Sequence, residues 1–386
     1  MSEHKGISSF SLLGGPLYRL GCRMGLVRHE TNTFRIGLLI SVFLWSTLVV
    51  LAFYSGFNIR LLSLAVLGAH IRLLVGIPLF FLAETWFAPR SSTFVSQLAT
   101  SHVVPQLELP LLEREIRRVT RWKNSWIPEA LCLVGAVLWS AFGSHLHLLG
   151  NSNAYQSNQM TAGSAVSYWY WIVCMPVFRF LILRWIWRLA LWTYFLWRVE
   201  RLKLELIPTH PDSTAGLGYL EVVHIHFTPL ILVLSAVQAG SFAEEISQGT
   251  MSIEGVYPIL ALMLVVDAVL FIGPLFIFTP KLWACQVKGR SDYAELAENY
   301  TAQFDTKWVS RKTSTDEPLL GSADIQSLAD LANSFSIVRN MRVVPIGKKL
   351  LISFGIAALI PILPLLLLKY PITELTKKFF TNLTGL

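Results

Sequence analysis

Three ionisable residues, Arg72, Arg179 and Asp267, lie within long apolar stretches of the sequence. A charged side chain at the centre of a bilayer costs about 2.5–3.5 kcal/mol on insertion scales, so such residues commonly mark ion pairs or ion pathways. All three stretches are expected to cross a membrane in the same direction, which puts the three groups at similar depth. We therefore predict an ion pair between Asp267 and either Arg179 or Arg72. These charges either lock the helices together, belong to a polar pathway or anion site, or extend to the membrane interface.

Segment 209–220, THPDSTAGLGYL, holds a second group of candidate residues. His210 and Asp212 supply an imidazole and a carboxylate, while Gly216 and Gly218 permit close backbone approach or unusual dihedral angles. The side chain of Asp212, Ser213 or Thr214 can also cap the helix that follows. The motif is therefore either a capped helix entry or a ligand or ion site that faces a cytoplasmic vestibule.

Signatures of metal binding and catalysis are weak. His224 and His226 are two residues apart, so on a helix they point about 200° away from each other and cannot easily share one metal. The same objection applies to His145 and His147, and the four cysteines are scattered singly. The sequence has none of the common hydrolase, metalloprotease or nucleotide-binding motifs. We predict no catalytic residue, no metal and no cofactor, which favours a protein that is not an enzyme.

The composition defines the elements that must position these residues. Of 386 residues, 53 % are hydrophobic and 15 % are charged, and the mean hydropathy is +0.53. A soluble domain carries about 25 % charged residues. The chain is therefore predicted to be a polytopic membrane protein, an all-α bundle of transmembrane helices.

Seven stretches are long and apolar enough to cross the hydrocarbon core, which takes about 20 residues. They cover residues 36–57, 61–83, 127–149, 165–197, 219–240, 256–278 and 350–368. The fourth is longer than a bilayer requires, so its end should project beyond the membrane. The seventh contains Pro361 and Pro364, so it is either kinked or re-entrant.

Lysine and arginine gather in alternate connections, which predicts a cytoplasmic N-terminus. The resulting organisation is a cytoplasmic segment 1–35, six transmembrane helices in 36–280, a cytoplasmic helical segment 281–349, and the seventh helix with its tail in 350–386. Within the last cytoplasmic segment we predict helices at 293–304 and 324–341.

The basic residues are expected to serve the membrane rather than nucleic acid. The net charge of +8 flanks the apolar stretches, which favours contact with anionic lipid head groups. Arg184 and Arg188 are predicted to reach lipid phosphates in the same way. Segment 109–123 is amphipathic, and is either an interfacial helix or a continuation of the third transmembrane helix.

Two motifs resemble those of a family of uncharacterised bacterial inner-membrane proteins. Segment 210–220, HPDSTAGLGYL, is similar to the HPD…GGLG-type motif of that family, with Ala215 in place of a usual glycine. Segments 327–346 and 360–375 are similar to its C-terminal region. The resemblance covers about the second half of the chain. It implies a multi-pass protein of the bacterial inner membrane, without implying an activity.

Three functions are compatible with these observations. The first is a channel or transporter-like protein for ions or small solutes, expected to be a homo-oligomer. The second is a membrane scaffold or sensor that binds a partner through its cytoplasmic segments. The third is a membrane-embedded enzyme that acts on a lipid-linked substrate. A channel predicts a polar path past the buried charges, and an enzyme predicts a cleft with converging His and Asp side chains.

Overall fold

The computed structural model describes residues 10–12, 14–16, 19, 33–56, 63–142, 165–310 and 322–365. Within these ranges every regular element is helical. The α-helices are α3 (Thr33–Tyr54), α4 (Leu67–His70), α5 (Ile77–Thr100), α6 (Leu109–Lys123), α7 (Trp126–Phe142), α8 (Ala165–Trp169), α9 (Met175–Glu200), α10 (Tyr219–Ile225), α11 (Thr228–Ser247), α12 (Ile253–Phe271), α13 (Thr279–Phe304), α14 (Ala323–Arg339) and α15 (Lys348–Leu359).

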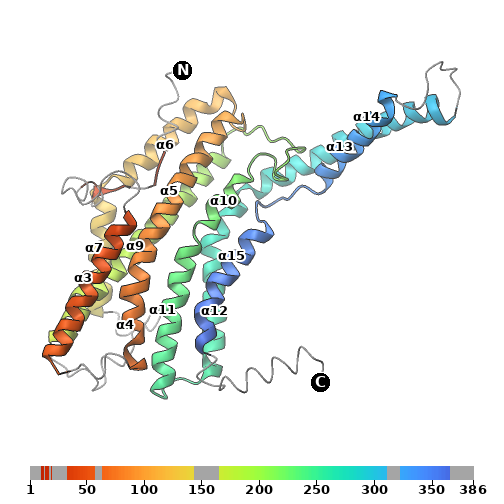
Figure 1. Ribbon diagram of the computed structural model, residues 1–386. Coiled ribbons are helices and arrows are strands. Elements are labelled where there is room, and N and C mark those ends of the chain that lie inside the picture. The colour runs from red at the N-terminus through yellow and green to blue at the C-terminus, as the bar shows by residue number, and fades with distance from the viewer. Residues whose placement is uncertain are drawn as a thin grey trace, which may run out of the picture.

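Six helical stretches in the described part are long and apolar enough to cross a membrane: Thr33–Tyr54, Leu67–Thr100, Ala165–Glu200, Tyr219–Ser247, Ile253–Phe271 and Lys348–Leu365. They lie alongside one another as the body of the bundle (Figure 1). The predicted all-α membrane bundle is thus supported for six of the seven stretches. The remaining stretch forms α7, a shorter apolar helix that packs along α9 and ends where the described residues end.

The second of these stretches extends well past its predicted end at residue 83. The second continues through α5 to Thr100, because the charges that follow the apolar run lie on helical turns rather than in a loop. The fourth runs to Glu200 and projects beyond the bilayer length, as predicted. The last stretch remains helical through Pro361, as α15 followed by a 3-10 turn at Ile360–Leu365. Whether the chain then crosses or returns concerns residues 366–386, outside the described part.

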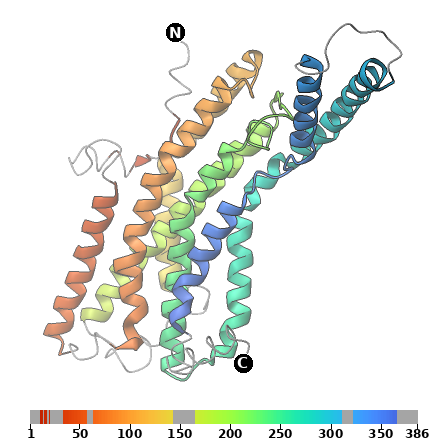
Figure 2. The same ribbon diagram turned by 45° about the vertical axis from the view of Figure 1, so that its right-hand side comes forward.

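A long helical hairpin extends away from the bundle. After α12 the chain bends through a 3-10 segment, Gly273–Phe278, and continues as α13, against which α14 packs (Figures 1 and 2). The helix predicted at 293–304 therefore begins much earlier, at Thr279, since its basic residues are compatible with a helix outside the membrane. We call the end of the bundle that carries α6 and this hairpin the basic end.

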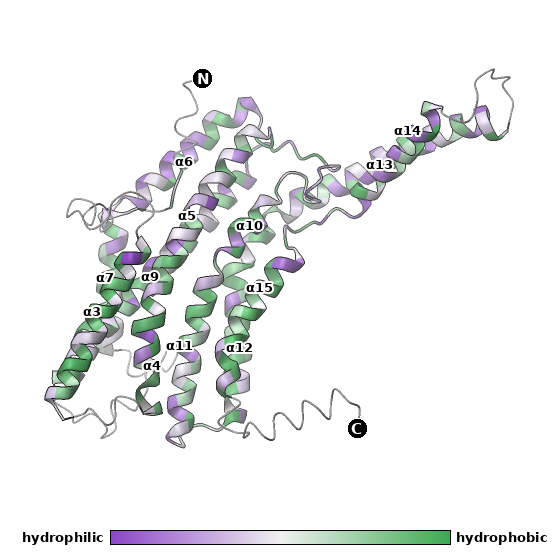
Figure 3. Ribbon diagram, viewed as in Figure 1, coloured by the Kyte–Doolittle hydropathy of each residue, from purple (hydrophilic) through white to green (hydrophobic). Residues whose placement is uncertain are grey.

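Apolar residues dominate the bundle body, while polar residues gather on α6, α13 and α14 (Figure 3). Large apolar side chains also lie on the outside, such as Leu39 at 66 % and Phe43 at 62 % exposure on α3. Water does not solvate such faces favourably, whereas lipid tails do. The architecture is consistent with an integral membrane protein.

Segment 109–123 forms a separate helix, α6, at the basic end. A break at Asn124 separates it from α7, so it does not continue the third predicted transmembrane helix. Its apolar face packs against α9. Glu115 on this face binds Arg198 of α9 at 2.8 Å and Arg118 at 2.9 Å.

Candidate functional site

Arg72 lies deep in the bundle and is 1 % exposed. Its guanidinium donates hydrogen bonds to the hydroxyl of Tyr170 at 2.8 Å and to Ser241 Oγ at 2.9 Å. Both Arg72 and Tyr170 lie in π-helical segments, at Ile71–Gly76 and Tyr170–Cys174. Such segments are rare within α-helices and are frequent at functional sites. These bonds connect three of the six stretches that are long and apolar enough to cross a membrane.

The stretch that carries Arg72 crosses α11 at very short range. Glu244 of α11 is fully buried and accepts the backbone N–H of Gly68 at 2.7 Å. At Gly240 a Cβ atom would lie 3.1 Å from the Cα of Gly68 and 2.8 Å from Ile71 Cδ1. Two glycines are therefore required for the helices to approach this closely.

The ion pair predicted for Asp267 does not form among the described residues. Arg179 instead turns to α7, donates to the carbonyl of Trp139 at 2.8 Å and lies over the Trp139 ring. Arg72 is bonded to Tyr170 and Ser241, neither of which belongs to α12. The prediction was wrong because similar depth does not fix the direction in which each helix presents its side chain.

A buried cluster that the sequence did not reveal lies between α5, α7 and α9. Glu84 binds Arg188 at 2.7 Å and Arg184 at 3.5 Å, and Glu129 approaches Arg184 at 3.7 Å. The carbonyl of Gly14 accepts from both arginines. The prediction that the two arginines reach lipid phosphates was therefore wrong. Arg184 and Arg188 are four residues apart and therefore share one face of a helix, while Glu84 and Glu129 lie in apolar parts of the sequence. This pattern could have indicated the cluster.

The HPD motif folds into a compact loop organised by Asp212. Its carboxylate accepts the backbone N–H groups of Thr214, Gly216 and Gly218 at 2.8, 3.2 and 2.7 Å. Burial alone would raise the pKa of Asp212, but these bonds and His210 at 2.8 Å hold it below its usual value. The predicted side-chain cap of α10 does not form, but Gly218 immediately precedes this helix, so the carboxylate fixes the backbone at the helix entry.

The same loop adopts strained backbone angles and joins distant segments. Ser213, Ala215 and Gly216 all have φ between +54° and +97°, which explains why glycine suits position 215. Arg342 donates to the carbonyl of Asp212 at 3.2 Å and to Glu221 at 3.0 Å. The motif therefore fastens the chain after α14 to the entry of α10.

The interpretation of His210 and Asp212 as a vestibule site is not favoured by this geometry. Neither residue lines either of the two larger hollows described below, and the carboxylate of Asp212 binds the backbone of the loop itself. His224 lies within the bundle and accepts a hydrogen bond from Trp192 at 3.1 Å. No group of three or more potential metal ligands is present among the described residues, and His145 and His147 lie outside them.

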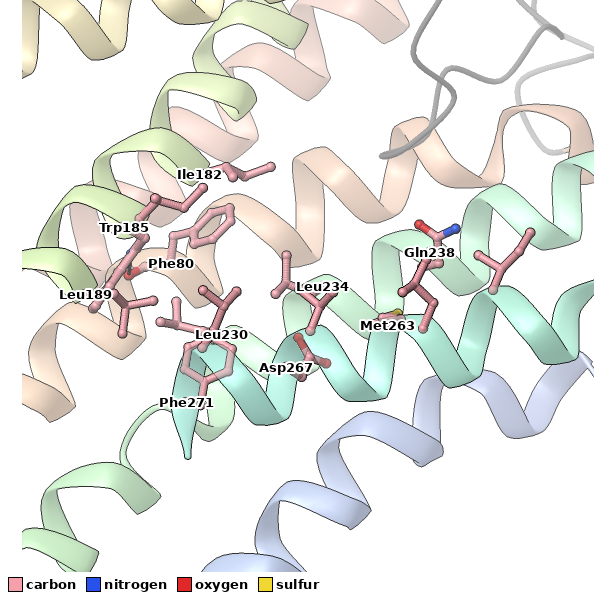
Figure 4. A pocket seen from close by; sticks show the side chains of 15 residues that line it. Phe80, Ile182, Trp185, Leu189, Leu230, Leu234, Gln238, Met263, Asp267 and Phe271 are labelled. Carbon is pink, nitrogen blue, oxygen red and sulfur yellow. Dashed lines mark hydrogen bonds between the residues drawn. The ribbon is translucent and has the colours of Figure 1, made fainter. Parts of the chain in front are cut away.

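A cavity of about 300 Å³ lies between α5, α9, α11 and α12 (Figure 4). Its wall is almost wholly apolar and includes three aromatic side chains, Phe80, Trp185 and Phe271. α12 covers one side loosely, since only 11 % of its most apolar 18-residue stretch is buried. We call this space the Asp267 cavity, after the single ionisable side chain among its lining residues.

Asp267 is 5 % exposed and projects from α12 into the cavity that Leu234 of α11 and Met263 of α12 also line (Figure 4). It forms no hydrogen bond or ion pair with any residue that the structure describes, and its Oδ2 is a buried acceptor without a partner. Gln238, at another point of the wall, supplies the other polar side chain besides the Trp185 indole. The arrangement can hold an apolar body and offers it one acidic contact.

A second hollow of about 550 Å³ lies at the basic end, between the chain before α10 and α13. Three lysines line it, Lys203, Lys281 and Lys288, together with Asp292. Lys281 donates to the carbonyl of Leu202, and burial lowers its pKa. This hollow offers three positive charges and one negative charge at the basic end.

No protein-family model, curated protein or solved structure matches this chain. The resemblance of segment 210–220 to a bacterial inner-membrane family therefore stays a prediction.

Proposed function

We propose that this protein is transporter-like and takes a small, mainly apolar molecule into the Asp267 cavity within the membrane. The observation that carries the proposal is an apolar intramembrane cavity with one unpartnered carboxyl group in its wall. Ionisable residues inside membrane bundles commonly mark substrate or ion pathways.

The size and walls of the cavity support a small organic ligand. Ligand pockets commonly measure about 300–1,000 Å³ and combine apolar walls with a few polar groups that orient the ligand. The Asp267 cavity lies at the lower end of this range. The loose packing of α12 provides a side through which a molecule dissolved in lipid can enter.

A transporter-like function is favoured over an ion channel by the contacts of the arginines. Arg72 and Arg179, expected to line a polar path, donate hydrogen bonds to neighbouring helices instead. An enzyme is less favoured, because the carboxylate of Asp212, one of its candidate residues, binds the backbone of its own loop and His210. The proposal keeps the predicted cytoplasmic N-terminus, the bacterial inner membrane, a homo-oligomer, and contact of the basic end with anionic lipid head groups.

Equilibrium binding of tritiated tert-butylbenzene to the protein in nanodiscs tests the proposal. We expect Met263→Trp, which fills the cavity, to weaken binding at least tenfold. The matched control is Val265→Trp, on the same helix but 59 % exposed on the outer face, which should bind like the wild type. Equal binding by the wild type and Met263→Trp, or none above protein-free nanodiscs, would refute the proposal.

The scaffold or sensor function is supported by a different observation. The α13–α14 hairpin projects from the bundle and exposes Trp283, Leu296 and Ile325 at 41–60 %. If this surface joins copies of the chain, Leu296→Glu should reduce the mass of the assembly in nanodiscs, measured by light scattering. Unchanged mass would count against the hairpin as an assembly surface.

A further inference from the structure

The surroundings of Asp267 restrict what can occupy the cavity. The lining residues from α5, α9 and α11 include no ionisable side chain, and α12 contributes Asp267 alone. The buried Arg72, Arg179 and Arg188 of the bundle make the contacts with Tyr170, Ser241, Trp139 and Glu84 given above. No cation of the described chain therefore neutralises this carboxylate.

An isolated carboxylate in apolar surroundings costs several kcal/mol unless it is paired or protonated. Asp267 therefore has two favourable states: a neutral acid, or a carboxylate paired with a cation in the cavity. The aromatic walls favour the second state as well. The faces of Phe, Tyr and Trp attract cations within about 6 Å of the ring centroid, and Phe80, Trp185 and Phe271 all line the space.

We infer that the ligand of the Asp267 cavity is a lipophilic organic cation, an ammonium group on an apolar body, and that it exchanges with a proton on Asp267. Binding converts the neutral acid to a carboxylate paired with the cation, and the proton leaves to water. No covalent bond of the ligand changes. The inference rests on the proposed function, since it assumes that the cavity is a binding site.

Two ligands of the same shape, one charged and one neutral, distinguish the contribution of charge to binding from the contribution of shape. Phenyltrimethylammonium carries a permanent positive charge, and tert-butylbenzene replaces its nitrogen with carbon. Both are measured as tritiated ligands, with the full-length protein in phosphatidylcholine nanodiscs at pH 5.5 and pH 8. The variants are Asp267→Asn and Glu254→Gln; the latter replaces the other acidic residue of α12 and serves as the control.

In the wild type and in Glu254→Gln, the cation should bind at least tenfold more tightly at pH 8 than at pH 5.5. In Asp267→Asn this pH dependence should vanish, and cation affinity at pH 8 should fall at least tenfold. Binding of tert-butylbenzene should change by less than about threefold in Asp267→Asn, which also shows that the cavity is intact.

Two results overturn the inference in different ways. If tert-butylbenzene binds and Met263→Trp blocks it, but the cation binds equally in the wild type and Asp267→Asn, the cationic ligand is refuted and the proposed function stands. If the wild type binds the cation without pH dependence, exchange with a proton at Asp267 is refuted. Loss of all specific tert-butylbenzene binding would instead refute the proposed function.

Discussion

Replacing Glu84 with glutamine should destabilise the protein more than any exposed charge substitution. Glu84 is 4 % exposed and pairs with Arg188 at 2.7 Å and Arg184 at 3.5 Å. With Glu129 the cluster contains two positive and two negative groups, so its formal charge is zero. Glu84→Gln leaves a buried charge of +1. Removing one partner of a buried ion pair costs about 3–5 kcal/mol.

The free energy of unfolding, from denaturant titration of the purified protein in mixed micelles, measures this effect. The control is Glu113→Gln on α6, where Glu113 pairs with an arginine whose side chain is 68 % exposed. Exposed pairs contribute about 0–1 kcal/mol. The double variant Glu84→Gln, Arg188→Gln restores neutrality and should be more stable than Glu84→Gln alone. Equal losses for Glu84→Gln and Glu113→Gln would refute this account of the cluster.

Asp212→Asn should destabilise the protein at neutral pH. The folded pKa of Asp212 is lowered, so its contribution is fully present above the unfolded pKa of about 3.9 and is lost as pH falls through the folded value. The stability difference between wild type and variant, followed by thermal unfolding from pH 7 downward, should therefore shrink in acid; a constant difference would contradict the role of the charge. Gly240→Ala should cost about 1–3 kcal/mol, because its Cβ would press on Gly68. Gly355→Ala, which meets nothing within 4 Å, should leave the unfolding free energy unchanged or higher; similar losses in both variants would contradict the close crossing of α4 and α11.

Much of the fold could be predicted because the membrane imposes its requirements on local sequence. A stretch such as 36–57 must be helical and apolar, since the bilayer offers no water to its backbone. The long fourth stretch and α6 were identified from length and amphipathic spacing in the same way. The boundary placed at Glu84 was wrong, because a glutamate in a single sequence looks like the end of an apolar run. Only the approach of Arg188 and Arg184 makes it compatible with the interior.

The candidate site was harder to predict than the fold. Asp267 was selected from its position in an apolar stretch, but its expected partners bind elsewhere, and the cavity around it also needs α5 and α9, which are distant from α12 in sequence. The HPD motif was recognised as a helix entry. Its bond to Arg342, 130 residues away, was beyond reach of spacing arguments.

The sequence by itself determined that the chain is helical, rich in apolar stretches, and marked by a few costly charges. Hydropathy and helical periodicity depend only on residues close together in the chain, so the amino-acid sequence is enough to reveal them. Only the tertiary structure decided which charged side chains form ion pairs with one another. An ion pair depends on the rotation of each helix about its axis, and packing against neighbours sets that rotation. The same packing paired Arg184 with Glu84, turned Arg179 towards Trp139, and left Asp267 in its cavity without a partner among the described residues.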